Sequence, residues 1–241
     1  MKPLETQGHS PKSERFAKGV SNTGQHEEGQ NARELSKSKN RRHLLDSAAD
    51  AIFKHGFRGA TIAAIQKISG LSRGMINLHF KTKENLLLAV AEDLSNSYSE
   101  RWNKIARNPD LSARDKLMGI IKVDLSPDIL NERDVAIWFA FRSEACSNPE
   151  YHKFIDSRDA SFHNTIVEIC QTLIDEGTYP NGDAHLAADA FIALFEGMWT
   201  DFHLHSEEFD RCRAERVCLY IANSLFPDHF DLWKVQRESE L

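Results

Sequence analysis

Apolar residues recur at three- and four-residue intervals along nearly the whole chain, and this spacing is the feature that most constrains the fold. Such a period places the apolar side chains on one face of an α-helix. The first clear stripe runs from Leu44 to Phe53, and the last runs from Val217 to Leu225. Strand-like alternation with hairpin turns is absent, and no repeat period is visible. The sequence therefore predicts an all-α protein.

Glycines and capping residues divide the first part of this helical region. Gly56 is expected to end the first helix, because glycine adopts the left-handed conformation at helix ends. Thr61 is a plausible N-cap for a short second helix, and a short third helix is expected over 73–79 after a break at Gly70. Thr82 is placed to cap a long fourth helix.

At least five further helical stretches are expected beyond residue 108. Ser112, Asp183 and Ser206 are the candidate N-caps of three of them. Their approximate ranges are 112–121, 135–147, 150–176, 183–202 and 206–225.

Composition argues against several classes of protein. The chain has 241 residues, of which 41% are hydrophobic and 27% are charged, the ordinary mix of a globular protein in water. No apolar run approaches the roughly 18 residues of a membrane-spanning helix, and no secretory signal is recognisable. The four cysteines show no CxxC spacing. We therefore expect a cytoplasmic protein with buried thiols, no membrane association, and neither disulfides nor a metal site.

The net charge of −6 would by itself argue against nucleic-acid binding, but the charge is unevenly distributed. Residues 37–84 carry ten Lys or Arg against three Asp or Glu, a net of +7. Residues 1–36 have a net charge of zero, and residues 85–241 have a net charge of −13. This asymmetry indicates that the basic segment meets a polyanion, and the alternative is a chance segregation of solvated charge.

The basic segment contains a predicted helix-turn-helix unit, which consists of two short helices joined by a turn with glycine. The second of these helices is expected to expose Arg73, Met75 and Asn77. These residue types suit guanine, the thymine methyl group and adenine in a major groove. Lys81 and Lys83 follow at positions that suit phosphate contacts. The pattern favours DNA binding.

Several strings in this segment fall into one register, and together they are similar to the DNA-binding domain of the TetR family of transcriptional repressors. The strings are Gly59-Ala-Thr61-Ile-Ala-Ala-Ile65, Ser69-Gly-Leu-Ser72, Gly74-Met-Ile76, His79-Phe-Lys-Thr-Lys83-Glu and Leu86-Leu87, within residues 42–88. The resemblance implies that the following residues face DNA: Thr61, Ser72, Arg73, Met75, Asn77, His79 and Lys83.

Two of these positions carry alternatives. Asn77 stands where the family usually has a tyrosine that contacts phosphate, so Asn77 could instead read a base. Gln66 and Ser69 also replace the usual alanines. For His79, the alternative to a DNA contact is a capping or packing role.

Two strings in the second half are similar to the choline-responsive, BetI-type branch of the same family. They are Ala136-Ile-Trp138-Phe-Ala-Phe141 and Leu194-Phe-Glu196-Gly-Met-Trp199. The resemblance implies an effector pocket among helices four to eight and a dimer interface built from the last two helices. A quaternary ammonium group needs aromatic faces and a carboxylate that balances its charge. Trp102, Trp138, Trp199 and Glu196 are the candidates, and the alternative is that the aromatic residues are core.

The expected organisation follows from these patterns. Residues 1–36 are rich in small and polar residues and are expected to form a disordered extension. Residues 37–84 are expected to form a three-helix, helix-turn-helix DNA-binding domain. Residues 85–230 are expected to form a helical effector-binding and dimerisation domain, and residues 231–241 a C-terminal tail.

We therefore expect a homodimeric repressor that binds a pseudo-palindromic operator in double-stranded DNA. A small-molecule effector would release it, with choline or a related quaternary ammonium compound as the candidate. The alternatives are a TetR-type regulator of a lipid, drug or efflux pathway, or a helical interaction module without regulated DNA binding.

An enzyme is not expected, and no cofactor is expected. The sequence contains no HExxH, no GxSxG and no Gly-rich phosphate loop. His203 and His205, near Cys212 and Cys218, invite a metal interpretation, but helix residues two apart point to different faces.

Overall fold

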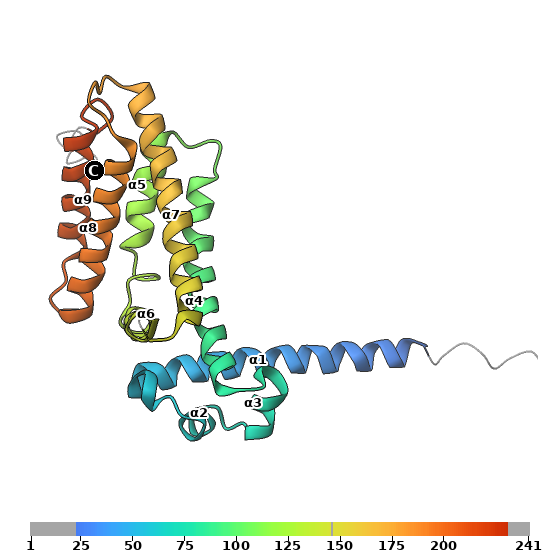
Figure 1. Ribbon diagram of the computed structural model, residues 1–241. Coiled ribbons are helices and arrows are strands. Elements are labelled where there is room, and N and C mark those ends of the chain that lie inside the picture. The colour runs from blue at the N-terminus through green and yellow to red at the C-terminus, as the bar shows by residue number, and fades with distance from the viewer. Residues whose placement is uncertain (1–22, 146, 231–241) are drawn as a thin grey trace, which may run out of the picture. The chain divides into compact units, whose positions relative to one another are not determined.

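The computed structural model describes the backbone of residues 23–145 and 147–230, and the side chains of residues 33–145, 147–151, 154 and 161–230. Within these ranges it contains helices and no strand, which confirms the predicted all-α class (Figure 1). The helices are α1 (Thr23–Gly59), α2 (Ile62–Ser69), α3 (Arg73–Phe80), α4 (Lys83–Ala106), α5 (Ala113–Asp124), α6 (Glu132–Ala145), α7 (Pro149–Glu176), α8 (Ala184–Leu204) and α9 (Arg211–Leu225).

The chain divides into two units, Met1–Arg41 and Arg42–Leu241, and the division lies within α1. In the first unit, residues 23–36 are helical, which differs from the disorder expected for residues 1–36. Ala, Arg, Glu and Leu over 32–35 favour a helix by intrinsic propensity, and the side chains described over 33–36 are exposed, with Leu35 at 58%. Residues 1–22 and the expected tail over 231–241 lie outside the described residues.

Most of the expected helix starts agree with the structure. The side chains of Thr61, Thr82, Ser112 and Asp183 each accept a hydrogen bond from a backbone N–H in the first turn of the helix that follows. The prediction for Ser206 is wrong, because Asp210 caps α9 and the hydroxyl of Ser206 donates instead to Glu132 Oε1, at 2.8 Å. Glu132 is far away in the sequence, so the local pattern could not reveal this competing partner.

The second unit begins with a helix-turn-helix module made of the end of α1, then α2, α3 and the first turns of α4. Gly56, at φ 70° and ψ 171°, interrupts the helical geometry near the end of α1. The module encloses an aliphatic core. Its members include Leu44, Leu45, Ala48, Ile52, Ile65, Ile76, Phe80, Leu86, Leu87 and Val90.

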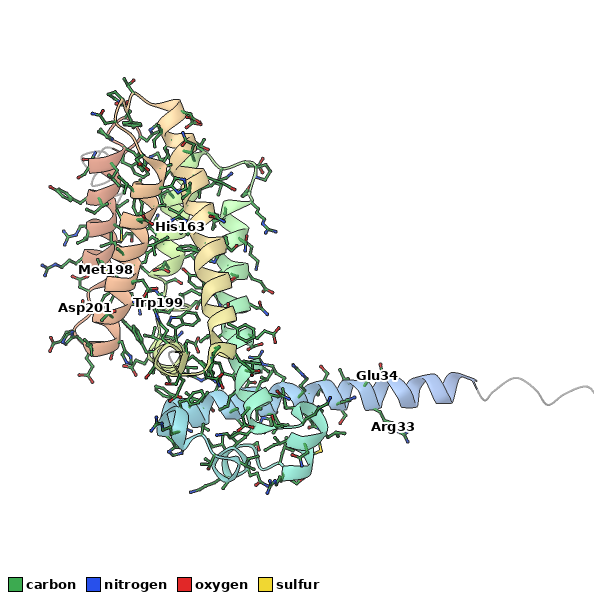
Figure 2. All side chains as sticks on the ribbon, viewed as in Figure 1. Arg33, Glu34, His163, Met198, Trp199 and Asp201 are labelled. Carbon is green, nitrogen blue, oxygen red and sulfur yellow. The ribbon has the colours of Figure 1, made fainter. Side chains whose placement is uncertain are left out.

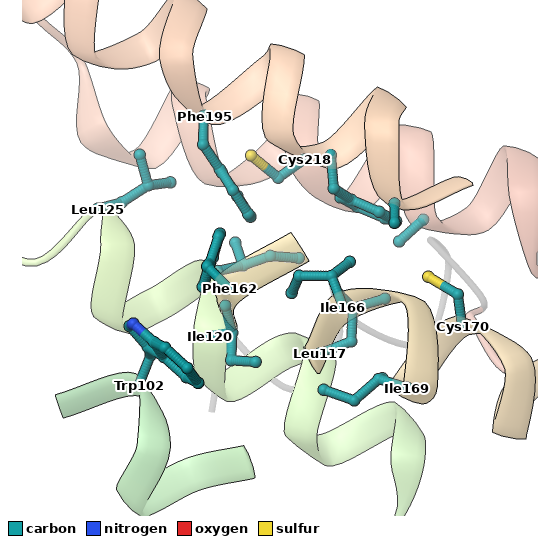
Figure 3. Packing of buried hydrophobic residues seen from close by; sticks show 14 of the residues in the cluster. Trp102, Leu117, Ile120, Leu125, Phe162, Ile166, Ile169, Cys170, Phe195 and Cys218 are labelled. Carbon is teal, nitrogen blue, oxygen red and sulfur yellow. The ribbon is translucent and has the colours of Figure 1, made fainter. Parts of the chain in front are cut away.

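The rest of the second unit is a helical bundle with a second core that is richer in aromatic rings. Figure 3 shows side chains from α4, α5, α7, α8 and α9 meeting there, among them Trp102, Phe162 and Phe195. Helices α7 and α8 make an extensive contact along the bundle (Figure 1). No described helix has the length and apolar character that crossing a bilayer requires.

Helix α6 contributes to both cores. Val135 and Trp138 are buried in the aromatic core, whereas Ile137 and Phe141 are buried in the aliphatic core of the helix-turn-helix module. Helix α4 is shared in the same way, with Leu86 near its start and Trp102 near its end. The boundary expected between residues 84 and 85 thus falls inside a helix that belongs to both regions.

Candidate DNA-binding face and effector site

Local hydrogen bonds fix the turn between α2 and α3. Gly70, at φ 68°, takes the left-handed conformation that glycine accepts without steric conflict, and its N–H donates to the carbonyl of Gln66 at 2.9 Å. The N–H of Leu71 donates to the hydroxyl of Ser69 at 3.1 Å. His43 Nε2 of α1 lies 2.9 Å from the carbonyl of Ser69 and ties the turn to the first helix. These contacts hold α3 at a defined angle.

One side of α3 is packed and the other faces solvent. Ile76 and Phe80 are buried in the aliphatic core. Arg73, Gly74, Asn77, Leu78 and Lys81 are exposed. Because residues four apart share a helix face, Arg73 and Asn77 form one polar and cationic stripe, and Lys81 follows directly after the helix. An exposed helix face with a guanidinium and an amide, followed by an ammonium, can meet the edges of bases and the adjoining phosphates.

The remaining residues predicted to contact DNA surround this stripe. Thr61 and Ser72 are exposed at the N-termini of α2 and α3, and Ser72 makes no capping hydrogen bond with its side chain. Lys83 is half-buried in the first turn of α4. His79 is half-buried beside Phe80, with ring centroids 6.3 Å apart.

The exposure of two apolar residues of α3 differs from what the sequence suggested. Met75, which was expected to face the thymine methyl group, is half-buried and packs against the module core. Leu78, which sequence reasoning passed over, is 63% exposed on the open face. Its spacing was the available signal. Leu78 comes directly after Asn77 in the sequence and follows Gly74 by four residues, which places Leu78 and Gly74 on the same side of the helix.

Lys81 follows α3 in a conformation that is unusual for its residue type. Its φ of 68° lies in the left-handed region, which is unfavourable for residues with a Cβ. Its N–H donates to the carbonyl of Asn77 at 3.1 Å, so the strained residue closes the recognition helix. The backbone of Lys81 is thereby fixed at the end of α3, and its side chain is exposed there.

In the bundle, three of the four predicted effector residues lie in one aromatic cluster, which we define as Tyr98, Trp102, Trp138, Phe162, Phe195 and Trp199. Tyr98 and Trp138 each meet the ring of Trp199 edge to face, with centroids 5.9 and 6.4 Å apart. Phe162 joins Trp102 to the cluster at 5.4 Å. Figure 2 shows Trp199 turned inward from α8, whereas Asp201 on the same helix is exposed.

The carboxylate within this aromatic cluster is Asp124, the last residue of α5. It is 1% exposed, and its Oδ1 accepts a hydrogen bond from the hydroxyl of Tyr98 at 2.7 Å. Its Oδ2 accepts a hydrogen bond from Nε1 of Trp199 at 3.1 Å. Sequence reasoning missed Asp124, although its position continues the apolar stripe of Leu117 and Ile121 and so places an acid where a core residue is expected.

Glu196, the carboxylate predicted from the sequence, makes a different contact. It accepts a hydrogen bond from Nη1 of Arg142 on α6, and both side chains are about one third exposed. The structure therefore places Trp102, Trp138 and Trp199 in one cluster, in which Trp199 contacts Asp124, and it pairs Glu196 with an arginine. The sequence could not show this pair, because the two residues are 54 positions apart.

Two groups report on the polarity of this interior. Burial, together with the nearby negative charge of Asp124, raises the pKa of the Cys218 thiol to about 12. Nε1 of Trp102 is buried and has no hydrogen-bond acceptor among the described residues. A buried donor without a partner is unfavourable, so a ligand that supplies an acceptor would satisfy it.

A polar cavity of about 540 Å³ lies elsewhere in the bundle, between α4, α5 and α7. Arg107 and Lys116 line it together with Glu168 and Glu176. None of the four predicted effector residues is among the residues that line it. Its lining lacks the aromatic faces that a quaternary ammonium group requires.

Ion pairs connect the helix-turn-helix module to the bundle. Arg133 Nε on α6 donates to Asp50 Oδ1 on α1 at 2.8 Å, and Arg133 Nη1 donates to Asp134 at 3.0 Å. Burial alone would lower the pKa of Arg133, but Asp50 and Asp134 raise it overall. Arg42 on α1 donates to both carboxylate oxygens of Asp93 on α4, at 2.8 and 2.9 Å.

The histidines and cysteines that invited a metal interpretation are not gathered into a site. His205 lies 3.1 Å from Asp201, and His203 stacks on Phe139 with ring centroids 4.6 Å apart. Cys218 is buried and Cys212 is exposed. No group of three or more metal-binding side chains occurs among the residues whose side chains are described.

Two family models match the chain. The model of bacterial regulatory proteins of the tetR family matches residues 44–90, and the model of the C-terminal part of BetI-type transcriptional repressors matches residues 113–227. The curated relatives include the HTH-type transcriptional regulator BetI of Klebsiella pneumoniae strain 342, which is 27% identical over 78% of this chain and 94% of its own length. BetI of Escherichia coli K12 is 26% identical over the same shares.

Solved structures share the fold. A transcriptional regulator from Pseudomonas aeruginosa PAO1 matches with a TM-score of 0.71 and 22% identity, over 79% of this chain and 91% of that one. A transcriptional regulator from Saccharomonospora viridis in complex with choline matches with a TM-score of 0.69 and 20% identity, over 77% and 96%. The matched families and relatives are transcriptional regulators and not enzymes.

Proposed function

The chain belongs to the TetR family of bacterial transcriptional regulators, and from this premise we propose that it is a cytoplasmic, homodimeric repressor that a quaternary ammonium effector releases from DNA. Residues 37–84 would read a pseudo-palindromic operator, and residues 85–230 would bind the effector and form the dimer. Choline or a closely related compound is the effector that we propose. No cofactor is required for this cycle.

The buried carboxylate of Asp124 within the aromatic cluster is the observation that carries the effector proposal. Trp138 and Tyr98 each contact Trp199 edge to face, and quaternary ammonium groups are recognised by cages of such aromatic rings. Asp124 is 1% exposed and lies against Tyr98 and Trp199, and a cation is attracted more strongly to a carboxylate that is shielded from water than to one on the surface. The S. viridis regulator, which has the same fold, was solved with choline, and this adds support.

The unpaired donor of Trp102 suggests what the rest of the effector looks like. Its Nε1 needs an acceptor, and the indole joins the aromatic cluster through Phe162. The hydroxyl oxygen of choline can accept that hydrogen bond while its trimethylammonium group lies among the other rings. Tetramethylammonium lacks the hydroxyl group and would leave Trp102 unsatisfied, so it should bind more weakly than choline.

Helix α6 offers the connection between effector and DNA. A cation that inserts beside Trp138 must displace rings that now touch, and Trp138 shares its helix with Phe141 of the module core. The effector acts only if it binds the DNA-incompetent arrangement more tightly than the competent one. In a dimer, the two copies of α3 must lie one DNA turn apart, roughly 34–36 Å, so a small rotation of each module weakens operator binding.

We propose that the dimer forms through the outer faces of α8 and α9. On α8, small residues lie between Leu186 and Leu204, both of which are 67% exposed. On α9, Tyr220 is 61% exposed and Val217 is 37% exposed. The small exposed residues of α8 on this face are Ala190, Ala193, Gly197 and Thr200. Small side chains allow a partner helix to approach closely, and the exposed apolar groups favour its burial.

The test begins with an operator selected from random duplex DNA by the purified full chain. Binding of that operator is then measured by fluorescence anisotropy during titration with choline chloride. We expect choline to weaken operator binding, and we expect Asp124→Asn to raise the choline concentration needed by at least about tenfold. The matched control is Glu196→Gln, which should leave the choline response unchanged because Glu196 faces Arg142.

Other outcomes would redirect the proposal. A selective operator with no response to choline, but a response to a fatty acid or a hydrophobic drug, would contradict the effector and favour a lipid, drug or efflux regulator. A response lost in Glu196→Gln but retained in Asp124→Asn would move the cation to the other carboxylate. If no sequence is selected at physiological salt, the chain is a helical interaction module and the DNA-reading proposal is wrong.

A further inference from the structure

The open face of α3 carries one large apolar side chain, Leu78. This side chain is 63% exposed, whereas the other apolar residues of α3 are buried or half-buried in the aliphatic core. Single exposed leucines are common on protein surfaces, so exposure alone assigns no role. Here, however, Leu78 belongs to the exposed part of α3, on the side of Gly74 and next to the side that carries Arg73 and Asn77, whose side chains suit a nucleic acid.

The helix surface one turn before Leu78, at Gly74, is open. Gly74 lies one helical turn before it, and a Cβ at Gly74 would meet only the hydroxyl oxygen of Ser72, at an ordinary distance of 3.6 Å. Packing within the chain therefore does not require glycine at this position, and glycine is unfavourable inside a helix. A glycine that the fold does not need lowers the surface beside Leu78, so that another molecule can approach the helix closely.

The chemistry of the major groove limits what Leu78 can contact there. The base edges in that groove present hydrogen-bond donors and acceptors, and the C5-methyl group of thymine is their apolar feature. A leucine cannot satisfy the polar edges, but it can bury a methyl group. Met75, the other apolar candidate on this helix, is occupied by the module core.

We infer that Leu78 is a specificity-determining residue that reads the methyl group of a thymine in each half of the operator. This inference rests on the DNA-binding function and adds a residue and a base to it. Asn77 and Arg73 would read polar base edges beside that thymine, and Lys81 would hold the phosphate backbone. The helix would thus combine one apolar contact with two directional ones.

The test removes the methyl group from the DNA and the side chain from the protein in turn. Each thymine of the selected operator is replaced by deoxyuridine, which lacks only the C5-methyl group. We expect one thymine per half-site at which this replacement weakens binding by about threefold to tenfold. In Leu78→Ala, binding of the unmodified operator should fall by a similar factor, and the deoxyuridine effect at that thymine should vanish.

Three comparisons make the outcome decisive. The inference is overturned if deoxyuridine has no effect at any position, or if its effect persists unchanged in Leu78→Ala. Met75→Ala, the matched control, should keep the deoxyuridine effect because Met75 faces the core. Arg73→Ala should lose its preference for a polar base and keep the deoxyuridine effect. If Arg73→Ala instead binds exactly as the parent does, the DNA-binding face itself has been misplaced. Equal melting temperatures would confirm that Leu78→Ala remains folded.

Discussion

The two cores of the second unit differ in chemistry. The core of the helix-turn-helix module is mainly aliphatic and closes around residues such as Leu44, Ile65 and Ile76. The core of the bundle is rich in aromatic rings and contains the carboxylate of Asp124. Aliphatic side chains that interdigitate closely define a single arrangement, which suits a module that must hold α3 at a fixed angle.

The aromatic core has properties that suit a receptor. It contains the buried carboxylate of Asp124, and the indole N–H of Trp102 has no acceptor among the described residues. A buried donor without a partner is unfavourable, and the hydroxyl oxygen of a ligand would supply an acceptor. The comparison indicates that the aliphatic core holds the exposed part of α3 in place, whereas the aromatic core carries the buried polar groups on which the effector proposal rests.

The largest effect on stability is expected for Phe141, a residue of α6 that belongs to the core of the helix-turn-helix module. This residue is 2% exposed in the module core, where it contacts Phe57 and Tyr151 with ring centroids 5.6 and 5.3 Å away. Phe141→Ala should lower the free energy of unfolding by about 3–5 kcal/mol, measured by urea denaturation. Phe139→Ala on the same helix is the control and should cost less, because Phe139 is half-buried. Equal losses would show that α6 does not complete the module core.

An intermediate effect, on dimer formation and operator affinity, is expected from a substitution on the outer face of α8. This helix belongs to the bundle and not to the helix-turn-helix module. A Cβ at Gly197 meets nothing within 4 Å in the chain, so Gly197→Leu should fold normally. If a second copy packs there, the variant becomes monomeric and operator affinity falls by about a hundredfold, because the two half-sites are no longer bound together. Light scattering after size exclusion measures the mass. Lys104→Leu, on α4, should remain dimeric; a dimeric Gly197→Leu would place the interface elsewhere.

The smallest effect on stability is expected at the ion pair between the two regions. Arg133→Met retains the apolar stem but loses the contact with Asp50, and since both side chains are more than a third exposed, we expect a loss of only about 1 kcal/mol. The informative measurement is the ratio of operator dissociation constants with and without choline chloride, which should change by about twofold to thirtyfold.

A matched pair within the bundle is the control for that measurement. Arg101 lies 2.9 Å from Asp128, and Arg101→Met should leave the ratio unchanged. An equal change in both variants would attribute the effect to net charge and not to the contact between the regions. Restoration of the parental ratio by the exchange Arg133→Asp with Asp50→Arg would tie the effect to this pair.

Much of the fold could be predicted because it depends on local patterns. The helical period gave the class, and threonine, serine and aspartate before apolar stripes marked four helix starts correctly. The pattern misled at Ser206, where a partner on α6 takes the hydroxyl group. It also left residues 23–36 outside the first helix, because this polar segment carries no apolar stripe in its sequence.

The candidate site was harder to predict than the fold. Sequence reasoning named three tryptophans that do meet, because large aromatic residues at helical spacing are buried in either interpretation. It selected Glu196 and missed Asp124, because which carboxylate is buried depends on partners such as Arg142 and Tyr98 from other helices. Likewise, α3 has only eight residues, too few turns for the period to separate Met75 from Leu78.

Helix α6 contributes residues to both cores, and this affects how new sensors could be engineered from this chain. Chimeric regulators are commonly imagined as a DNA reader joined to a foreign sensor at one point along the chain. A junction after α4 would here replace Ile137, Phe141, Ala145 and Tyr151, which complete the hydrophobic interior of the reader. A transplanted sensor would have to carry these four side chains on its own α6 and on the start of its α7, so the workable boundary follows the packed faces of helices and is not a single point in the sequence.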